Sequence, residues 1–160
     1  RRVLFRSVIN HVGDTMAMVV RHIRETTPGV TQVGLLATSG TVTSGVYKSV
    51  IEAAGLSQVV PDAPMQTRVM ESIYGASGVK AGFTSGECSA HLADAIAHLQ
   101  ARGADVIVLG CTELPLIELA DTGAQRAPLI DPTAILAGRC VALATAARDS
   151  RPAAAEAGAS

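Results

Sequence analysis

The sequence predicts an α/β protein in which helices flank a parallel β-sheet, and two stretches carry this prediction. Residues 106–109 read V-I-V-L, an uncharged and largely β-branched run that is typical of a strand covered on both faces. Residues 33–37 read V-G-L-L-A and are followed by a short turn and a helical pattern. Strands that alternate with helices need crossover connections, which place neighbouring strands parallel in one sheet.

The other elements follow from the spacing of apolar residues, which recur every three or four positions where one face of a helix is buried. We expect helices at residues 8–25, 43–54, 62–74, 88–102, 114–119 and 132–147, and strands at 33–37, 57–61, 106–109 and 128–131. Asp131 is expected to cap the last helix. Thr84 to Glu87 fit a capping box that opens the helix at residue 88, which gives Glu87 a structural role.

Composition limits the partners and the location of the protein. The chain has 160 residues, 13 basic and 14 acidic, so we expect neither a nucleic-acid footprint nor a polybasic membrane patch. No apolar run approaches the roughly 20 residues that span a bilayer. Residues 1–7 lack the apolar core of a signal peptide. Three widely spaced cysteines do not make a disulfide framework, and reduced thiols indicate the cytoplasm.

Cys111 is the strongest candidate for a functional residue. It follows the strand at 106–109, and ligands of open α/β sheets bind just beyond the carboxyl ends of strands. Gly110 would leave room for a substrate to approach the thiol. Pro115 fits the first turn of a following helix. The backbone amides of Thr112 and Glu113 could then point at an anion bound near the sulfur atom.

The remaining cysteines and the histidines give weaker signals. Cys88 and Cys140 lie within predicted helices, and we interpret them as small, buried, inert side chains. His91 and His98 are seven positions apart on one helix, too far to share a metal ion, and no C-x-x-C pair is present. We therefore expect no metal site.

The turn at residues 38–41, T-S-G-T, joins a strand to a helix and has two interpretations. Its amides, its hydroxyl groups and the helix dipole could bind an anion. Alternatively, Thr41, Thr43 and Ser44 only cap the helix. The residues alone leave both interpretations open, although the absence of G-x-G-x-x-G excludes a dinucleotide fingerprint.

Several motifs together resemble the aspartate/glutamate racemase superfamily, which also includes hydantoin racemases, maleate isomerases and arylmalonate decarboxylases. The stretch I-V-L-G-C-T-E-L-P at 107–115 is similar to the second cysteine motif of that family. It is accompanied by L-L-A-T-S-G-T-V-T-S-G-V-Y-K at 35–48, I-Y-G-A-S-G-V-K-A-G at 73–82 and P-L-I-D-P-T at 128–133. The resemblance extends from about residue 8 to residue 143 and is specific because the motifs occur together.

This resemblance implies a fold of two lobes that enclose a cleft. Residues 30–120 would form one nearly complete Rossmann-like lobe that carries the site, residues 8–29 a helix remnant of the first lobe, and residues 121–147 a return to that lobe. Residues 148–160 lack periodicity, and we expect a disordered tail. Residues 1–7, R-R-V-L-F-R-S, instead resemble the translated end of a sequencing adapter, so we expect a non-native leader on an N-terminally truncated protein.

The resemblance also implies an amino acid racemase that uses no cofactor. Two cysteines would face the α-carbon from opposite sides, one removing the α-proton as a thiolate and the other donating a proton. Cys111 would be one of them, with a thiol pKa lowered by amides or cations. The residues implied to bind the substrate or orient the cysteine are Ser39, Gly40, Thr41, Lys80, Thr112 and Glu113. The implied partners are an amino acid or dicarboxylate substrate and, for the full-length protein, a second copy.

Two departures from the family pattern affect this interpretation. The first cysteine motif, a cysteine followed by asparagine and a small hydroxyl residue, does not occur in the chain, so we expect this fragment alone to be inactive. Glu113 stands where the glutamate racemase branch typically has histidine, which favours the aspartate racemase branch. Hydantoin racemase, maleate isomerase and decarboxylase chemistry stay open. From another class, the chain could be a non-catalytic α/β domain that binds a small anion at residues 38–41.

Overall fold

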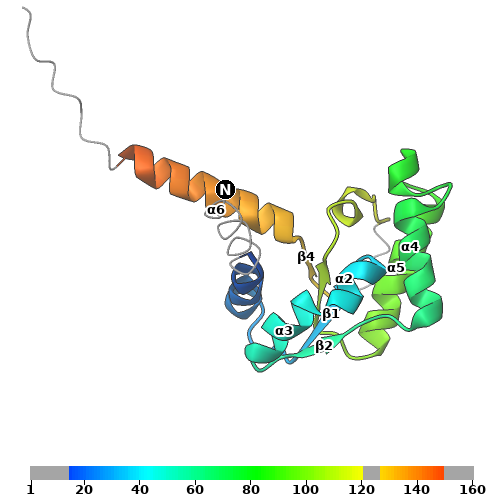
Figure 1. The fold of residues 1–160 in the computed structure, drawn as a ribbon, viewed down its shortest axis with the longest axis horizontal. Helices are drawn as coiled ribbons and strands as arrows, with labels where there is room; N and C mark the ends of the chain where they lie inside the picture. The colour runs from blue at the N-terminus through cyan, green and yellow to red at the C-terminus, as the bar shows by residue number, and fades with distance from the viewer. Residues whose placement is uncertain (1–14, 121–126, 150–160) are drawn as a thin grey trace, which may run out of the picture.

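The chain folds around a wholly parallel sheet of four strands, in the order β2-β1-β3-β4 (Figure 1). The computed structural model describes residues 15–120 and 127–149. The strands are β1 (Gln32–Leu36), β2 (Ser57–Val59), β3 (Val106–Leu109) and β4 (Leu129–Ile130). All four lie within the strands expected from the sequence or begin one residue earlier. The predicted α/β fold with flanking helices is therefore confirmed.

Helices connect these strands and cover both faces of the sheet. A helix occupies residues 15–26 of the described chain, so the expected helix at 8–25 is confirmed only there. The others are α2 (Ser39–Ser44), α3 (Val46–Ala53), α4 (Ala63–Tyr74), α5 (Glu87–Ala101), α6 (Pro132–Asp149) and the 3-10 turns η1 (Val79–Ala81) and η2 (Leu114–Leu116). The helix expected at 114–119 is thus a single short turn.

Two expectations about helix starts were wrong. The helix expected from residue 43 begins at Ser39, because the hydroxyl of Thr38 accepts a hydrogen bond from the amide of Thr41 and caps it there. Gly45, with φ 67°, then separates α2 from α3. The capping box is also absent, because the N-cap of α5 is Gly86, which offers no side chain. Asp131, in contrast, accepts from the amide of Thr133 at 2.8 Å, as expected of a cap.

The core lies on the two faces of the sheet, as the alternation of side chains along each strand requires. On one face, Leu36, Ile107 and Leu109 pack against α4 and α5. On the other face, alternate residues of the same strands pack against α3 and the helix at residues 15–26. The buried residues of this second cluster include Val33, Leu35, Val106 and Val108. Both faces of β1 and β3 are therefore covered, which explains their uninterrupted apolar sequences.

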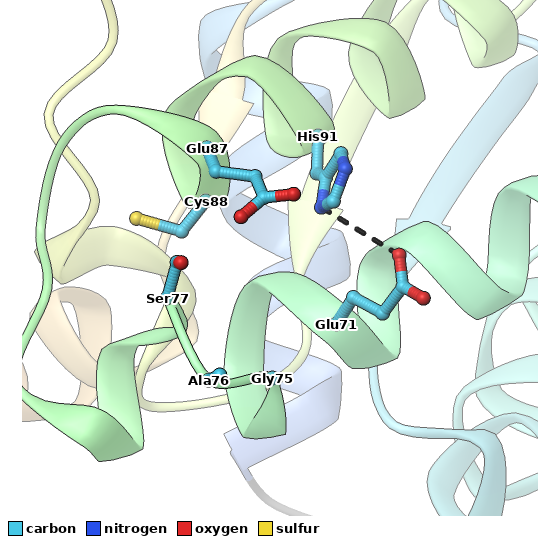
Figure 2. Close-up of a pocket in the computed structure, with 7 residues that line it drawn as sticks. All are labelled: Glu71, Gly75, Ala76, Ser77, Glu87, Cys88 and His91. Atoms are coloured by element: carbon cyan, nitrogen blue, oxygen red, sulfur yellow. Dashed lines mark ion pairs between the residues drawn. The ribbon is translucent and has the colours of Figure 1, made fainter.

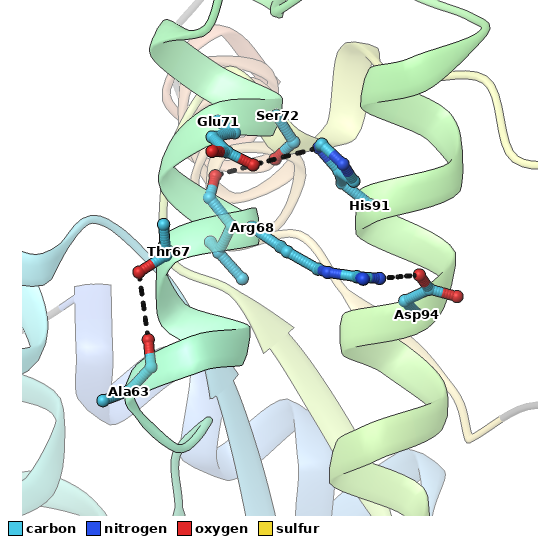
Figure 3. A network of polar contacts seen from close by, with 8 residues as sticks. Ala63, Thr67, Arg68, Glu71, Ser72, His91 and Asp94 are labelled. Carbon is cyan, nitrogen blue, oxygen red and sulfur yellow. Dashed lines mark hydrogen bonds and ion pairs between the residues drawn. The ribbon is translucent and has the colours of Figure 1, made fainter.

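Polar contacts join α4 to α5 on the outside of the first cluster (Figure 3). Arg68 of α4 pairs with Asp94 of α5, and His91 Nδ1 lies 3.8 Å from Glu71 Oε2. Exposed ion pairs of this kind contribute little to stability. They orient two helices that are held together mainly by buried apolar residues.

The C-terminal part differs from expectation at Cys140. β4 pairs with β3 and extends the same sheet, and the return of residues 121–147 to a first lobe stays a prediction. Cys140 was expected to be buried and is exposed on α6, which extends away from the sheet in Figure 1. Its neighbours Val141 and Leu143 are also exposed. The buried state expected for Cys88 is confirmed, at 1% exposure. The assignment of α6 to a first lobe stays a prediction.

Some expectations fall outside the residues that are described. They concern the leader at 1–7, the start of the first helix, the loop at 121–126 and the tail from residue 150. Within residues 15–120 and 127–149, no helix has both the length and the apolar character needed to cross a membrane.

Replacing Asp105 should weaken the junction between β1 and β3. Its Oδ2 accepts hydrogen bonds from the amides of Thr31 and Gln32 at 2.8 and 2.9 Å, and these bonds hold the pKa of its carboxyl below the usual value. We expect Asp105→Ala to lower the free energy of unfolding at pH 7 by about 1–2 kcal/mol, measured by urea denaturation. The lowered pKa of Asp105 stabilises the folded protein at pH values above the unfolded pKa, near 4, and this stabilisation is lost as the pH falls below it. The difference in free energy of unfolding between the parent and Asp105→Ala should therefore shrink in acid.

Asp94→Ala is the matched control for that measurement. Asp94 is also an exposed aspartate, but its partner is the side chain of Arg68 rather than two strand amides. We expect Asp94→Ala to lower the free energy of unfolding by less than Asp105→Ala does. Equal losses in the two variants would contradict the role given to Asp105.

Candidate active site

The candidate site lies where two strand ends meet at the middle of the sheet. β1 leads through α2 and α3 to β2 on one side, whereas β3 leads to β4 on the other side. Adjacent parallel strands whose connections leave in opposite directions form a switch point, where open α/β sheets bind their ligands. The last rung between the two strands runs from the amide of Gly110 to the carbonyl of Leu36, at 2.7 Å. The turns at 38–41 and 110–113 therefore begin side by side.

Gly110 is required by packing rather than by access to the thiol. A Cβ atom at this position would lie 2.8 Å from Leu35 Cδ1 and 3.2 Å from Ala37 Cβ and Tyr47 Cε2. The space that we expected a substrate to use is therefore filled by side chains of the chain itself. The backbone before Cys111 therefore packs directly against core side chains, and this packing fixes the position at which the turn begins.

The turn after Cys111 is fixed in the same way from its other end. The amide of Leu114 donates to the carbonyl of Cys111 at 3.2 Å, and the Leu114 side chain is completely buried. Pro115 occupies the first turn of η2, as expected. The peptide segment between the strand and Leu114 is thus held at both ends, while the side chains of Cys111 and Glu113 are only partly buried.

Glu113 joins three of the residues singled out from the sequence. Its Oε2 accepts from Cys111 Sγ at 2.8 Å and from Thr112 Oγ1 at 2.9 Å. Its other oxygen, Oε1, lies 3.1 Å from Lys80 Nζ. One carboxylate therefore bridges a thiol, a hydroxyl group and an ammonium group. Hydrogen bonds from these donors lower the pKa of Glu113 to about 2, so it is ionised at neutral pH.

Lys80, which contacts Glu113, lies on a loop that is held in a compact shape by hydrogen bonds between its own backbone groups. The loop makes successive turn hydrogen bonds, from Gly78 N to Gly75 O at 2.9 Å and from Ala81 N to Gly78 O at 3.0 Å. Gly78 has no room for a side chain, since a Cβ atom there would lie 2.8 Å from the carbonyl of Glu71. The loop therefore fixes the backbone position of Lys80. The ammonium group of Lys80 also lies 5.1 Å from the centre of the Tyr74 ring.

Ser39, Gly40 and Thr41 lie at the same edge of the sheet, at the start of α2. The hydroxyl groups of Thr38 and Thr41 are 3.0 Å apart, and Gln66 Nε2 lies 3.3 Å from Ser39 Oγ. The cap of α2 is Thr38, so the interpretation of Thr41, Thr43 and Ser44 as N-caps was wrong. The use of Ser39, Gly40 and Thr41 for substrate binding stays a prediction.

The thiol of Cys111 differs from expectation in its proton affinity. We expected amides or cations to lower its pKa, but the pKa is raised. Burial is the largest cause, and the hydrogen bond to the Glu113 carboxylate, which favours the protonated thiol, is the next. The charge of Lys80 acts in the opposite direction and does not outweigh them. At neutral pH the sulfur therefore keeps its proton, and Glu113 is the acceptor that holds it.

Sequence reasoning missed Tyr47, which belongs to the wall of the site. Burial raises the pKa of its phenol, and the ionised forms of Cys111 and Asp131 raise it further. Its ring packs into the second core cluster and limits the space beside Gly110. The available signal was rarity, because the chain has only two tyrosines.

A separate pocket of about 240 Å³ lies between the end of α4 and the start of α5 (Figure 2). Its lining residues are Glu71, Gly75, Ala76, Ser77, Glu87, Cys88 and His91. None of them was predicted as a site residue, and the Glu71–His91 ion pair crosses it. Over the described residues, no group of three or more His, Cys, Asp or Glu side chains is arranged to hold a metal ion.

The fold is shared with solved racemase structures. An aspartate racemase from Picrophilus torridus is 28% identical, with a TM-score of 0.63 over 84% of this chain and 52% of its own. An aspartate racemase homologue from Pyrococcus horikoshii is 25% identical, with a TM-score of 0.65 over 84% of this chain and 55% of its own. The chain thus spans about half the length of these solved relatives.

Sequence comparisons agree with the structural ones. An uncharacterized protein of Pectobacterium carotovorum is 36% identical over 65% of this chain and 63% of its own length. A glutamate racemase of Corynebacterium glutamicum is 36% identical over 54% of this chain and 29% of its own length. The sequence profile of Asp/Glu/Hydantoin racemases matches residues 10–140, which is more than half of the chain. The chain therefore belongs to the Asp/Glu/Hydantoin racemase family.

Proposed function

We propose that this chain is part of a cofactor-independent racemase of acidic amino acids in which Cys111 exchanges a proton with the α-carbon of the substrate. The observation that carries the proposal is the contact of Cys111 Sγ with Glu113 Oε2, 2.8 Å long, at the switch point of a racemase-family sheet. The thiol lies at the border of the core, partly buried and next to a charged pair.

In the proposed reaction, Cys111 begins as the proton donor. Its thiol is protonated at neutral pH, because burial and, next, the hydrogen bond to Glu113 raise its pKa. The S–H bond breaks as a new C–H bond forms at the carbanionic α-carbon, and the electron pair stays on sulfur. Lys80, which is close enough for its charge to act on Cys111, then stabilises the thiolate. In the reverse direction the thiolate removes the α-proton.

The opposing base is a second cysteine that we propose lies outside this chain. Cys88 is buried, and its sulfur lies 3.2 Å from the carbonyl of Ser85 within the α5 start. Cys140 is exposed on α6. The chain by itself is then inactive, in keeping with its coverage of about half of each solved relative.

The substrate that we propose is aspartate, with glutamate as the second candidate. Glu113 stands at the position where the glutamate racemase branch typically has histidine. Aspartate racemase names also occur among the solved relatives, whereas a curated relative is named glutamate racemase. Ser39, Gly40, Thr41 and Thr112 are the proposed contacts for the carboxylate and amino groups. The first three follow β1 and Thr112 follows the neighbouring strand β3, at the same edge of the sheet.

Exchange of the α-proton in deuterated water tests this function in the full-length gene product. We expect L- and D-aspartate to take up deuterium, and Cys111→Ala to slow the exchange by at least about 100-fold, because a general acid–base contributes roughly 10²–10⁴. Cys140→Ala is the matched control and should exchange at the rate of the parent. Exchange that survives Cys111→Ala, or no exchange with either acidic amino acid, would refute the proposal.

The proton affinity of Cys111 gives a second prediction, measured by mass spectrometry of the iodoacetamide-modified peptide across pH. Glu113→Gln removes the main electrostatic reason for the raised pKa, so alkylation at pH 7 should accelerate about threefold to tenfold. Lys80→Met removes a cause that lowers the pKa, so alkylation should slow. A Cys140→Ser background removes the competing exposed thiol. Equal rates in the two variants would show that neither charge tunes Cys111 and would favour a simple anion-binding domain.

A further inference from the structure

The ammonium group of Lys80 is already occupied by an acidic side chain of the protein. Lys80 Nζ lies 3.1 Å from Glu113 Oε1, and the side chains are 47% and 22% exposed. A substrate carboxylate that approaches this lysine therefore finds the position beside the ammonium group already taken by the carboxylate of Glu113.

Glu113 can release Lys80 without becoming an isolated charge. Its second oxygen, Oε2, keeps the hydrogen bonds from Cys111 and Thr112 when Oε1 loses its contact. The carboxylate would then rest on two neutral donors of its own turn. Because the pair is partly exposed, its attraction is screened by water, and an incoming anion can replace Glu113 at small cost.

Lys80 can also stay in place while its partner changes. Its loop is closed by backbone hydrogen bonds, and its ammonium group is 5.1 Å from the Tyr74 ring centre, an attraction that does not depend on Glu113. Nearly half of the side chain is open to solvent, which leaves an approach for a second anion.

We propose that Glu113 is a specificity-determining residue that competes with the carboxylate of the ligand for Lys80. This inference rests on the proposed function, in which the ligand is a carboxylic acid. Binding exchanges one ion pair for another: the ligand carboxylate takes Lys80 Nζ, and Glu113 Oε1 turns to solvent. Neutral ligands cannot make this exchange, so Glu113 shields the lysine from them.

Malonate is the probe for this competition, because it carries carboxylates but no amino group that could bind to Glu113. The dissociation constant of malonate is measured by isothermal titration calorimetry on the full-length gene product, at constant ionic strength and pH 7. We expect Glu113→Gln to tighten malonate binding about threefold to tenfold, because Lys80 becomes free. Lys80→Met should weaken binding at least tenfold. The double variant should match Lys80→Met, because Glu113 matters only through Lys80.

Glu71→Gln is the matched control, since it removes one negative charge from a glutamate paired with His91 instead of Lys80. Its dissociation constant should stay within about twofold of the parent. Unchanged or weaker binding in Glu113→Gln would overturn the competition, and so would equal tightening in Glu71→Gln or no binding by any variant. The expected pattern without α-proton exchange in the full-length protein would refute the racemase proposal alone.

Discussion

The pairing of β1 with β3 is the constraint on which the rest of the structure depends. Four residue pairs, from Val33–Val106 to Leu36–Leu109, bring together segments that are more than 70 positions apart in the chain. Asp105 secures the start of this pairing through the amides of β1, and Gly110 closes its end against Leu36. Because both faces of both strands are packed, a one-residue shift in register would move every side chain to the opposite face and disrupt both core clusters. The turns that carry the candidate site inherit their positions from this register.

At the site, the decisive feature is the carboxylate of Glu113. After burial, its hydrogen bond is the next cause of the raised pKa of the Cys111 thiol, and its other oxygen pairs with Lys80. A cysteine beside a lysine would by itself be interpreted as an activated thiolate, because a cation lowers a thiol pKa. Burial of the thiol and the carboxylate between the two residues reverse this conclusion. The chemistry of the family can use such a thiol, because a racemase needs a proton donor as much as it needs a base.

Local rules predicted the elements whose causes are local. Apolar runs predicted strands β1 and β3, and the position of Asp131 directly before Pro132 predicted its role as a helix cap. Thr84 to Glu87 failed as a capping box because Thr84 is instead bonded to Glu118, across 34 positions of sequence. Gly110 was expected to leave room for a substrate, because the sequence does not reveal which side chains pack against this glycine. Leu35 and Tyr47 occupy that space in the folded chain.

The sequence by itself determined the family, the α/β class and the identity of Cys111, Lys80 and Glu113 as residues of interest. These conclusions depend on residue type and spacing, which are properties of the chain before it folds. Only the tertiary structure decided that Lys80 and Glu113, 33 positions apart, form an ion pair and that the thiol between strand and turn stays protonated. Proton affinity depends on burial and on charges within a few ångströms, and those distances exist only once the loops are packed together.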